Sequence, residues 1–279
     1  MTQTCCPRTN RAAAIAQLAA LSAQALLLRL SLLVAAALSL APAARADGCD
    51  RTGATEVEVA QVTDELEIQL KDERNIKLAG VKTLSTGTES ETGPKATSFI
   101  REMVARGHVS ARVLAPIADR WGRLSSDIFV GDENLQAALV RKGLAVARPD
   151  DLRGPCWQAI RAAETQARHD NAGFWATPDG ILKATDGAKL TERDGLFSLA
   201  SGEVRHVSRR KTRSFVDFGA PGSNALFLMI DNRALTRMEK LGFKLEQLAG
   251  HKILVRGVVL NGRSPHMVID DLEAIEFWE

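Results

Sequence analysis

The sequence predicts a mainly β protein with helices, built as two small β-barrels in succession. Short runs in which apolar and polar residues alternate, as in strands, occur before residue 84 and again after residue 195. Between these regions, three segments that begin near Gly93, Leu135 and Trp157 have the apolar spacing of amphipathic helices. The chain of 279 residues, 45% apolar and 25% charged, is long enough for two domains with ordinary cores.

The first segment has the features of a signal peptide. Arg8 and Arg11 precede a long Ala/Leu stretch, and Ala44-Arg45-Ala46 offers the small residues that a signal peptidase needs. Arg29 interrupts the stretch, which leaves it short of the roughly 20 apolar residues of a membrane span. We therefore expect residues 1–46 to be removed, no stable span afterwards, and export to the periplasm or the medium. The alternative is a retained membrane anchor.

Charge alone identifies no partner. The formal net charge is +2, and residues 1–46 hold four of the 36 basic residues and none of the 34 acidic ones. Without that segment the chain is slightly acidic, so bulk charge gives no argument for nucleic acid or membrane.

The cysteines predict one disulfide. Cys5 and Cys6 belong to the signal segment, so Cys49 and Cys156 remain as an even pair in an oxidising compartment. Two free thiols are the alternative. Two distant cysteines without a histidine cluster do not make a zinc site.

The first barrel with its helices is expected within residues 47–176. Turn residues at 71–75 separate two strands of a hairpin, and Gly93-Pro94 begins the first helix after a polar loop. We expect strands at 57–62, 66–70, 76–81, 109–113 and 124–130, and helices at 93–104, 135–144 and 157–169.

A polar segment, residues 177–194, reads as a linker to a second domain at 195–279. We expect strands at 202–207, 213–218, 226–230, 252–260 and 267–270, and a helix at 234–241. Three strands, a helix and two strands is the order of an OB-fold.

Several segments match a known family in sequence order. They are the turn Asp119-Arg120-Trp121-Gly122-Arg123, the helix at 135–145 that ends in Gly-Leu-Ala, and the helix at 164–175 that ends in Gly-Phe-Trp. Together with the Gly93-Pro94 helix entry, they resemble the staphylococcal nuclease (thermonuclease) family over about residues 56–176. The resemblance implies a five-stranded OB-type barrel with three helices. Residues 248–259 are similar to a stretch of nucleic-acid-binding OB modules, and to the C-terminal extension of some exported bacterial thermonuclease-like proteins.

The resemblance implies a degenerate catalytic site. The family hydrolyses phosphodiesters with two arginines, metal-binding aspartates and a glutamate; here Arg123 matches one arginine and Lys77 replaces the other. Lys82 stands where a metal-binding aspartate is expected, and Ser85 where the glutamate is expected. Arg123 and Lys77 are therefore the candidate catalytic residues, without the family's general base and with a lysine that would oppose a metal.

Two further assignments stay open at this point. Asp64 or Glu65 would fill one carboxylate position of a metal site, depending on a shift of one residue. Arg123 is either a phosphate ligand or a turn residue that pairs with Asp119 or Asp127.

Candidate nucleic-acid contacts lie in two places. Trp121 would stack a base beside Arg120, or would simply cover the barrel edge. A basic stretch near an aromatic residue in the second domain suits the phosphates and bases of a single strand, or is a solvated hairpin tip. Its residues are Arg209, Arg210, Lys211 and Arg213.

The sequence therefore predicts an exported thermonuclease-like protein that binds single-stranded DNA or RNA, or another anionic ligand, with little or no catalysis. The alternatives are an active metal-dependent phosphodiesterase with a rearranged site and a periplasmic protein-interaction module whose partner is unknown. We expect no cofactor, and calcium only if the nuclease site works. Whether the chain is an enzyme is left open.

Overall fold

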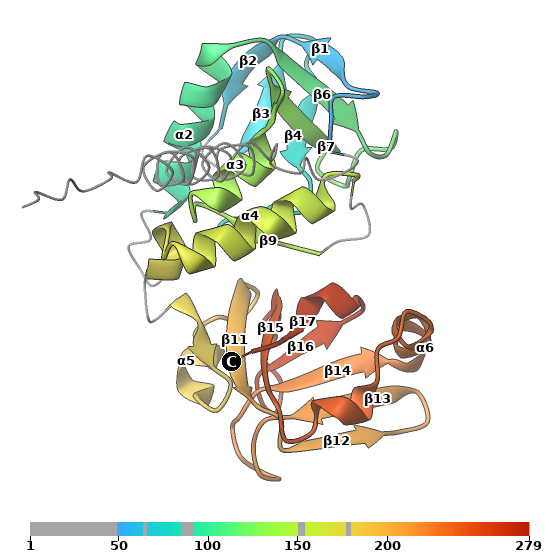
Figure 1. Ribbon diagram of the computed structural model, residues 1–279. Helices are drawn as coiled ribbons and strands as arrows, with labels where there is room; N and C mark the ends of the chain where they lie inside the picture. The colour runs from blue at the N-terminus through green and yellow to red at the C-terminus, as the bar shows by residue number, and fades with distance from the viewer. Residues whose placement is uncertain (1–48, 64–65, 85–91, 150–153, 177–179, 279) are drawn as a thin grey trace, which may run out of the picture. The chain divides into compact units, whose positions relative to one another are not determined.

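The computed structural model describes residues 49–63, 66–84, 92–149, 154–176 and 180–278, and its first part is a curled β-sheet (Figure 1). The strand order is β1-β6-β7-β4-β3-β2, with β8 paired to β7. Because β1 and β2 follow each other in sequence but lie at opposite ends of this order, the sheet must curl into a barrel-like shape. The strands are β1 (Thr55–Val57), β2 (Val59–Val62), β3 (Glu67–Leu70), β4 (Asn75–Leu78), β6 (Val109–Val113), β7 (Arg123–Val130) and β8 (Glu133–Asn134). The predicted mainly β fold with a first helix-bearing barrel is confirmed.

Alternate residues of these strands fill the barrel. Ile68 and Ile76 are fully buried, while their neighbours Glu67 and Lys77 face the other side of the sheet and are half-buried. One face of β3 and β4 thus builds the core, and the other presents charged side chains.

The strand expected at 76–81 is interrupted, which corrects the sequence prediction. After β4, Gly80 adopts a positive φ of 70°, and a short strand β5 (Val81–Lys82) pairs with β9 (Val146–Ala147) instead of continuing the sheet. The Arg148 N–H donates to the Gly80 carbonyl. This break brings Lys82 beside the chain segment that carries Arg148.

Three helices accompany the first sheet: α2 (Thr92–Arg106), α3 (Leu135–Arg141) and α4 (Trp157–His169). The Asn134 side chain caps α3 by accepting from the Ala137 N–H. Gly143 follows the C-cap of α3, and an added Cβ there would collide with the Ala172 carbonyl, so glycine is required for the close approach to η1 (Gly173–Ala176). The three predicted helices are confirmed.

The predicted disulfide between Cys49 and Cys156 is confirmed, with a Cα–Cα distance of 4.4 Å. It joins the beginning of the described chain to the N-terminal end of α4. The signal segment and its cleavage position lie outside the described residues. Within the described ranges, no helix is long and apolar enough to cross a membrane.

The second part of the chain contains two four-stranded sheets around their own apolar core. Their orders are β10-β11-β15-β17 and β12-β13-β14-β16. The strands are β10 (Leu182–Lys183), β11 (Phe197–Glu203), β12 (His206–Arg209), β13 (Arg213–Asp217), β14 (Phe227–Asp231), β15 (Lys252–Val258), β16 (His266–Ile269) and β17 (Ile275–Phe277). Helix α6 (Asn232–Lys240) and the 3-10 helices η3 (Leu245–Leu248) and η4 (Leu272–Ala274) complete this part.

The structure differs from the sequence prediction at two places here. The segment expected as a linker contains β10 and helix α5 (Gly187–Thr191), and Ala184 and Leu190 are fully buried in the second core. The strand expected at 202–207 is divided between β11 and β12, because the chain crosses from one sheet to the other there.

Residues 48–279 form a single compact unit, and a group of buried charges lies where α4 meets β15 and β17. Arg256 donates through Nη1 to Glu164 and to the Ala147 carbonyl, while the Ala147 N–H donates to Glu164 Oε1 at 2.8 Å. Glu276 pairs with Arg256 and with Arg161 at 3.1 and 2.9 Å. Arg168 pairs with both Glu164 and Glu276. Strand β9 is therefore held by side chains of α4 and β15.

Candidate functional site: a cationic cluster on the first barrel

The turn before β7 is held by the side chain of Asp119. Its Oδ1 accepts from the N–H groups of Trp121 and Arg123, each at 3.0 Å. Gly122 has a φ of 78°, which a residue with a side chain rarely adopts. The turn that the sequence singled out is thus a rigid support for Arg123.

Arg123 is fixed by two carboxylates from different elements. Its Nε and Nη2 donate to Asp119 Oδ2 at 2.9 and 2.7 Å, and its Nη1 donates to Glu67 Oε1 of β3 at 2.6 Å. Hydrogen bonds from Arg123 lower the pKa of the Asp119 carboxyl to about 2. Asp119 is therefore the turn partner of Arg123, whereas Asp127 pairs with Arg112.

Glu67 is the site residue that the sequence analysis missed. It lies directly opposite Lys77 in the antiparallel pair of β3 and β4, and β4 lies beside β7 in parallel register. Its polar position in an alternating strand showed that it faces away from the core. The register that brings it to Arg123, 56 residues away, was not readable from the sequence.

Lys82 lies among other cations. Lys82 is exposed at the surface, but nearby protein atoms partly desolvate its ammonium group and lower its pKa; the positive charges of Arg148, Arg123 and Lys77 lower that pKa further. We call Lys77, Lys82, Arg123 and Arg148 the cationic cluster. They come from β4, β5, β7 and the residue after β9, so the break in the strand after Leu78 is what brings them together.

The described residues of this region do not fit a divalent cation. Glu67 and Asp119, the two acids paired with Arg123, both already accept hydrogen bonds from its guanidinium. Across the described parts of the chain, no three His, Cys, Asp or Glu side chains are grouped so that they could hold a metal. The predicted metal ligands Asp64 and Glu65 lie outside the described residues. Lys82 would repel a divalent cation placed beside it.

Trp121 is exposed at the edge of the cluster, with 61% of its surface accessible. The guanidinium carbon of Arg120 lies 4.0 Å from the indole centroid, and that of Arg123 lies 4.7 Å from it. The indole is therefore held by two cations while it remains accessible to solvent. This arrangement suits a base that stacks next to a bound phosphate.

The basic hairpin of the second barrel separates into two groups. Arg209 is held by Glu239 and Glu246 at 2.6 and 2.7 Å, so its charge is balanced within the fold. Arg210, Lys211 and Arg213 are exposed at the tip between β12 and β13. These three residues stay candidate contacts, on a different barrel from the cationic cluster.

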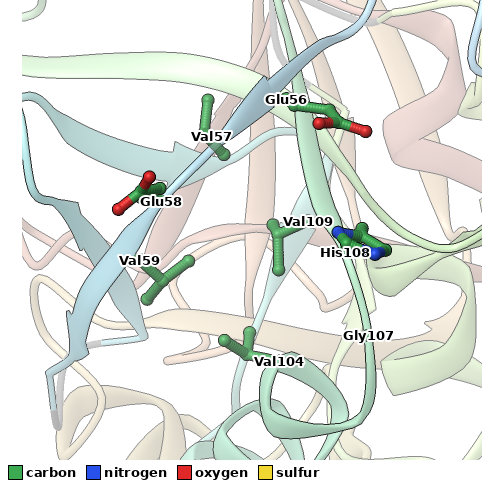
Figure 2. A pocket seen from close by; sticks show the side chains of 8 residues that line it. All are labelled: Glu56, Val57, Glu58, Val59, Val104, Gly107, His108 and Val109. Atoms are coloured by element: carbon green, nitrogen blue, oxygen red, sulfur yellow. The ribbon is translucent and has the colours of Figure 1, made fainter.

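A hollow of about 430 Å³ opens on the first barrel, away from any of the predicted site residues (Figure 2). Valines of β1, β2, α2 and β6 line it together with Glu56, Glu58 and His108. Glu58 is paired with Lys71 at 2.7 Å, and the residues that line the hollow include no Lys or Arg. It is therefore unsuited to a phosphate.

The fold and this cluster define a small helix-bearing β-barrel domain with a positively charged site at one end of its central strands. The family model of staphylococcal nuclease homologues matches residues 75–177, from β4 to the end of η1. This part of the chain is similar to staphylococcal nuclease homologues. The match does not include β1–β3 or the second barrel. A search of curated proteins found no match.

Proposed function

We propose that the cationic cluster binds the phosphodiester backbone of nucleic acid, without a divalent cation and with little or no hydrolysis. The observation that carries the proposal is the strand pairing that sets Lys77 of β4 beside β7, which begins at Arg123, and Lys82 of β5 beside β9, which ends before Arg148. The charges of these three neighbours act on Lys82. In this family the corresponding region handles phosphodiesters with a metal; here an ammonium group stands among cations in its place. Among the described residues, Glu67 and Asp119 are the carboxylates paired with this cluster, both through Arg123, and the surplus of positive charge favours an anion.

The chemistry of the acids supports weak or absent catalysis. A general base works best with a pKa near the working pH, and the Asp119 carboxyl, with a pKa of about 2, binds a proton too weakly. Asp119 accepts four hydrogen bonds from its own turn and from Arg123, and Glu67 accepts one from Arg123 Nη1 through Oε1. Their role in this proposal is to fix the guanidinium.

Export is part of the same proposal. The signal-like segment and the cysteine pair support a protein that works in an oxidising compartment, where nucleic acid or another polyanion would be encountered outside the cytoplasm.

The test is the salt dependence of binding to a labelled single-stranded oligonucleotide. Each phosphate contact that is lost lowers the slope of log affinity against log salt by about 0.7. The double variant Lys77→Gln/Lys82→Gln should lower the slope by about 1.4 and weaken binding. Lys71→Gln, on the same barrel but paired with Glu58, is the matched control and should change neither. Equal slopes for the double variant and the wild type would refute the assignment.

Fragment length during the same incubation distinguishes the second candidate. We expect an intact oligonucleotide with calcium and with chelator. Calcium-dependent cleavage that Arg123→Ala abolishes would instead support a phosphodiesterase with a rearranged site, in which Asp64 or Glu65 acts. Absence of binding at low salt would favour a protein-interaction module.

A further inference from the structure

The outer face of the second barrel's β12-β13-β14-β16 sheet carries a row of aromatic and apolar side chains. On the inner face, Val216, Leu228 and Met267 are buried in the core. Their neighbours along each strand point to the opposite side and are only partly buried. Cross-strand register aligns the outer residues of β13, β14 and β16. We call this surface the aromatic face: Phe215, Phe227, Met229, His266 and Val268.

Rings on this face are arranged as a platform. Phe227 and His266 are stacked, with centroids 5.1 Å apart and planes at 12°, and Phe215 lies 6.2 Å from Phe227. Val268, in register with Met229, is 48% exposed, so the face is open to solvent at β16. Phe215, Phe227 and His266 are partly buried, and the exposed part of these rings suits stacking with flat, unpaired bases.

Cations stand at both ends of the aromatic face. Arg213 occupies the same side of β13 as Phe215, two residues before it, and is exposed. At the other end, a hollow of about 300 Å³ is lined by Val268 and Leu260 of the second barrel and by Arg148, together with the carboxylates of Asp270 and Asp271. The guanidinium carbon of Arg148 lies 5.7 Å from the centroid of Phe197, which also lines this hollow.

Arg148 therefore belongs to two surfaces. It is a member of the cationic cluster, because its charge acts on Lys82, and it lines the hollow that leads to the aromatic face. A chain of phosphates bound at the cluster would reach the second barrel past Arg148, which is the cation available in this hollow because Arg256 is buried and paired with Glu164 and Glu276. Asp270 and Asp271 in the same lining would repel phosphates beyond Arg148. Asp217, in register with Phe227 on the same face, would repel a phosphate there but can accept hydrogen bonds from base amino groups.

We propose that the aromatic face binds the bases of single-stranded nucleic acid, whose phosphates continue from the cationic cluster past Arg148 to Arg213. The proposal rests on the proposed function of the first barrel and adds to it the ligand class. A duplex would not fit, since its bases are stacked on each other and not available to the rings. The two barrels then form one extended site for an unpaired strand.

The test compares wild type with the double variant Phe215→Leu/Phe227→Leu, which keeps apolar volume but removes the rings. Affinity for a long single-stranded oligonucleotide should fall at least tenfold, which corresponds to about 1.4 kcal/mol. The control is Phe277→Leu: Phe277 is also an exposed ring beside a histidine, His251, but lies on β17 of the other sheet. It should bind as wild type does, and all three proteins should have matching circular dichroism and thermal transitions.

A strand that carries phosphates but lacks bases separates this proposal from the one it rests on. Wild type and Phe215→Leu/Phe227→Leu should bind this abasic strand equally, because the cationic cluster is unchanged in that variant. Equal affinity of wild type and double variant for the base-containing strand would overturn the aromatic-face proposal while leaving the cluster intact. If Lys77→Gln/Lys82→Gln also fails to weaken binding, the proposed function of the first barrel fails with it. Wild-type binding of duplex as tight as that of single strand would overturn the ligand class.

Discussion

Arg256 Nη1 lies 2.9 Å from Glu164 Oε2 in the interior of the protein, where the two side chains are 1% and 0% exposed. The pair links β15 of the second barrel to α4 of the first barrel domain. Arg256 also donates to the carbonyl of Ala147, and Glu164 accepts from the N–H of Ala147. Because β9 pairs with β5, this buried pair supports the strand that carries Lys82.

Substituting either residue of this pair should destabilise the protein, and the loss should be larger for Glu164 than for Arg256. Glu164 faces three guanidinium groups, those of Arg161, Arg168 and Arg256, so Glu164→Gln leaves several buried positive charges unbalanced. We expect a loss of about 3–5 kcal/mol in the free energy of unfolding. Arg256→Met should cost less, since Glu164 keeps two cationic partners.

Denaturant unfolding of both single variants and of the double variant measures this. The double-mutant cycle should give a coupling energy of at least about 1 kcal/mol, because the two residues are in direct contact. Additive effects, or a larger loss for Arg256→Met than for Glu164→Gln, would contradict the description of the charge group.

Low pH should destabilise the protein by protonating Glu276, which belongs to the same group of buried charges. Burial raises the pKa of this carboxyl, but hydrogen bonds and charge from Arg168, with Arg161 and Arg256, outweigh burial and lower the pKa to about 2. The folded pKa lies below the ordinary value of 4.5, so the stabilisation is present above about pH 4.5 and is lost as pH falls towards 2. We expect at most about 3 kcal/mol from this group.

Melting temperatures between pH 5 and pH 2 (about the range that these pKa values define) should fall more steeply for wild type than for Glu276→Gln. The variant should be less stable near neutral pH and should approach the wild type in acid. Parallel curves would show that Glu276 does not titrate as described.

Lys82 should lower the free energy of unfolding while it strengthens oligonucleotide binding. Its positive charge is disfavoured in the folded protein, first by burial and then by Arg148, Arg123 and Lys77. Lys82→Gln should therefore raise the free energy of unfolding slightly, by about 0.5 kcal/mol because the side chain is partly exposed, while weakening oligonucleotide binding. The check pairs thermal melts with binding curves. A variant that is less stable, or that binds as well as wild type, would remove Lys82 from the site.

Because of Lys82, oligonucleotide binding should weaken at alkaline pH. A lowered pKa means that Lys82 loses its proton at a lower pH than an ordinary lysine does, and with it part of the attraction for an anion. Affinity should thus decline as pH rises above neutrality, and it should decline less in Lys82→Arg. Binding constants measured over that range for both proteins provide the comparison.

Glu67→Gln should change affinity in the opposite direction. The substitution removes a negative charge beside the cluster and releases Arg123 Nη1, which now donates to Glu67 at 2.6 Å. We expect oligonucleotide binding to become tighter by about two- to fivefold, since one repulsive charge near a phosphate is lost. Glu102→Gln, on α2 and paired with Arg106, is the control with the same loss of charge. Weaker binding by Glu67→Gln would mean that Glu67 is needed to orient the guanidinium.

Local patterns predicted the fold well. Helix α4 has the predicted ends because its apolar residues recur at helical spacing, and the disulfide follows from an even pair of cysteines after the signal-like segment. The break after Leu78 was not predicted, although Gly80 falls where the alternation of Ile76 and Leu78 would place the next apolar residue. The pairing of Val81 with β9 is a long-range contact that no local pattern shows.

The site was harder to predict because its contacts are long-range. The sequence identified Arg123, Lys77 and Lys82 individually, but not Arg148 as their neighbour or Glu67 as the partner of Arg123. Strand register determines both contacts. The pairing of Glu164 with Arg256, 92 residues apart, likewise depends on how the second barrel packs on α4.

The most direct measurement is the affinity of the protein for a single-stranded oligonucleotide in calcium and in chelator, at matched ionic strength. A cluster in which lysine and arginine replace the metal should bind equally well in both, and Lys77→Gln/Lys82→Gln should lose affinity in both. Binding that requires calcium and survives the double substitution would contradict the account, because it would place the phosphate on a metal rather than on these side chains.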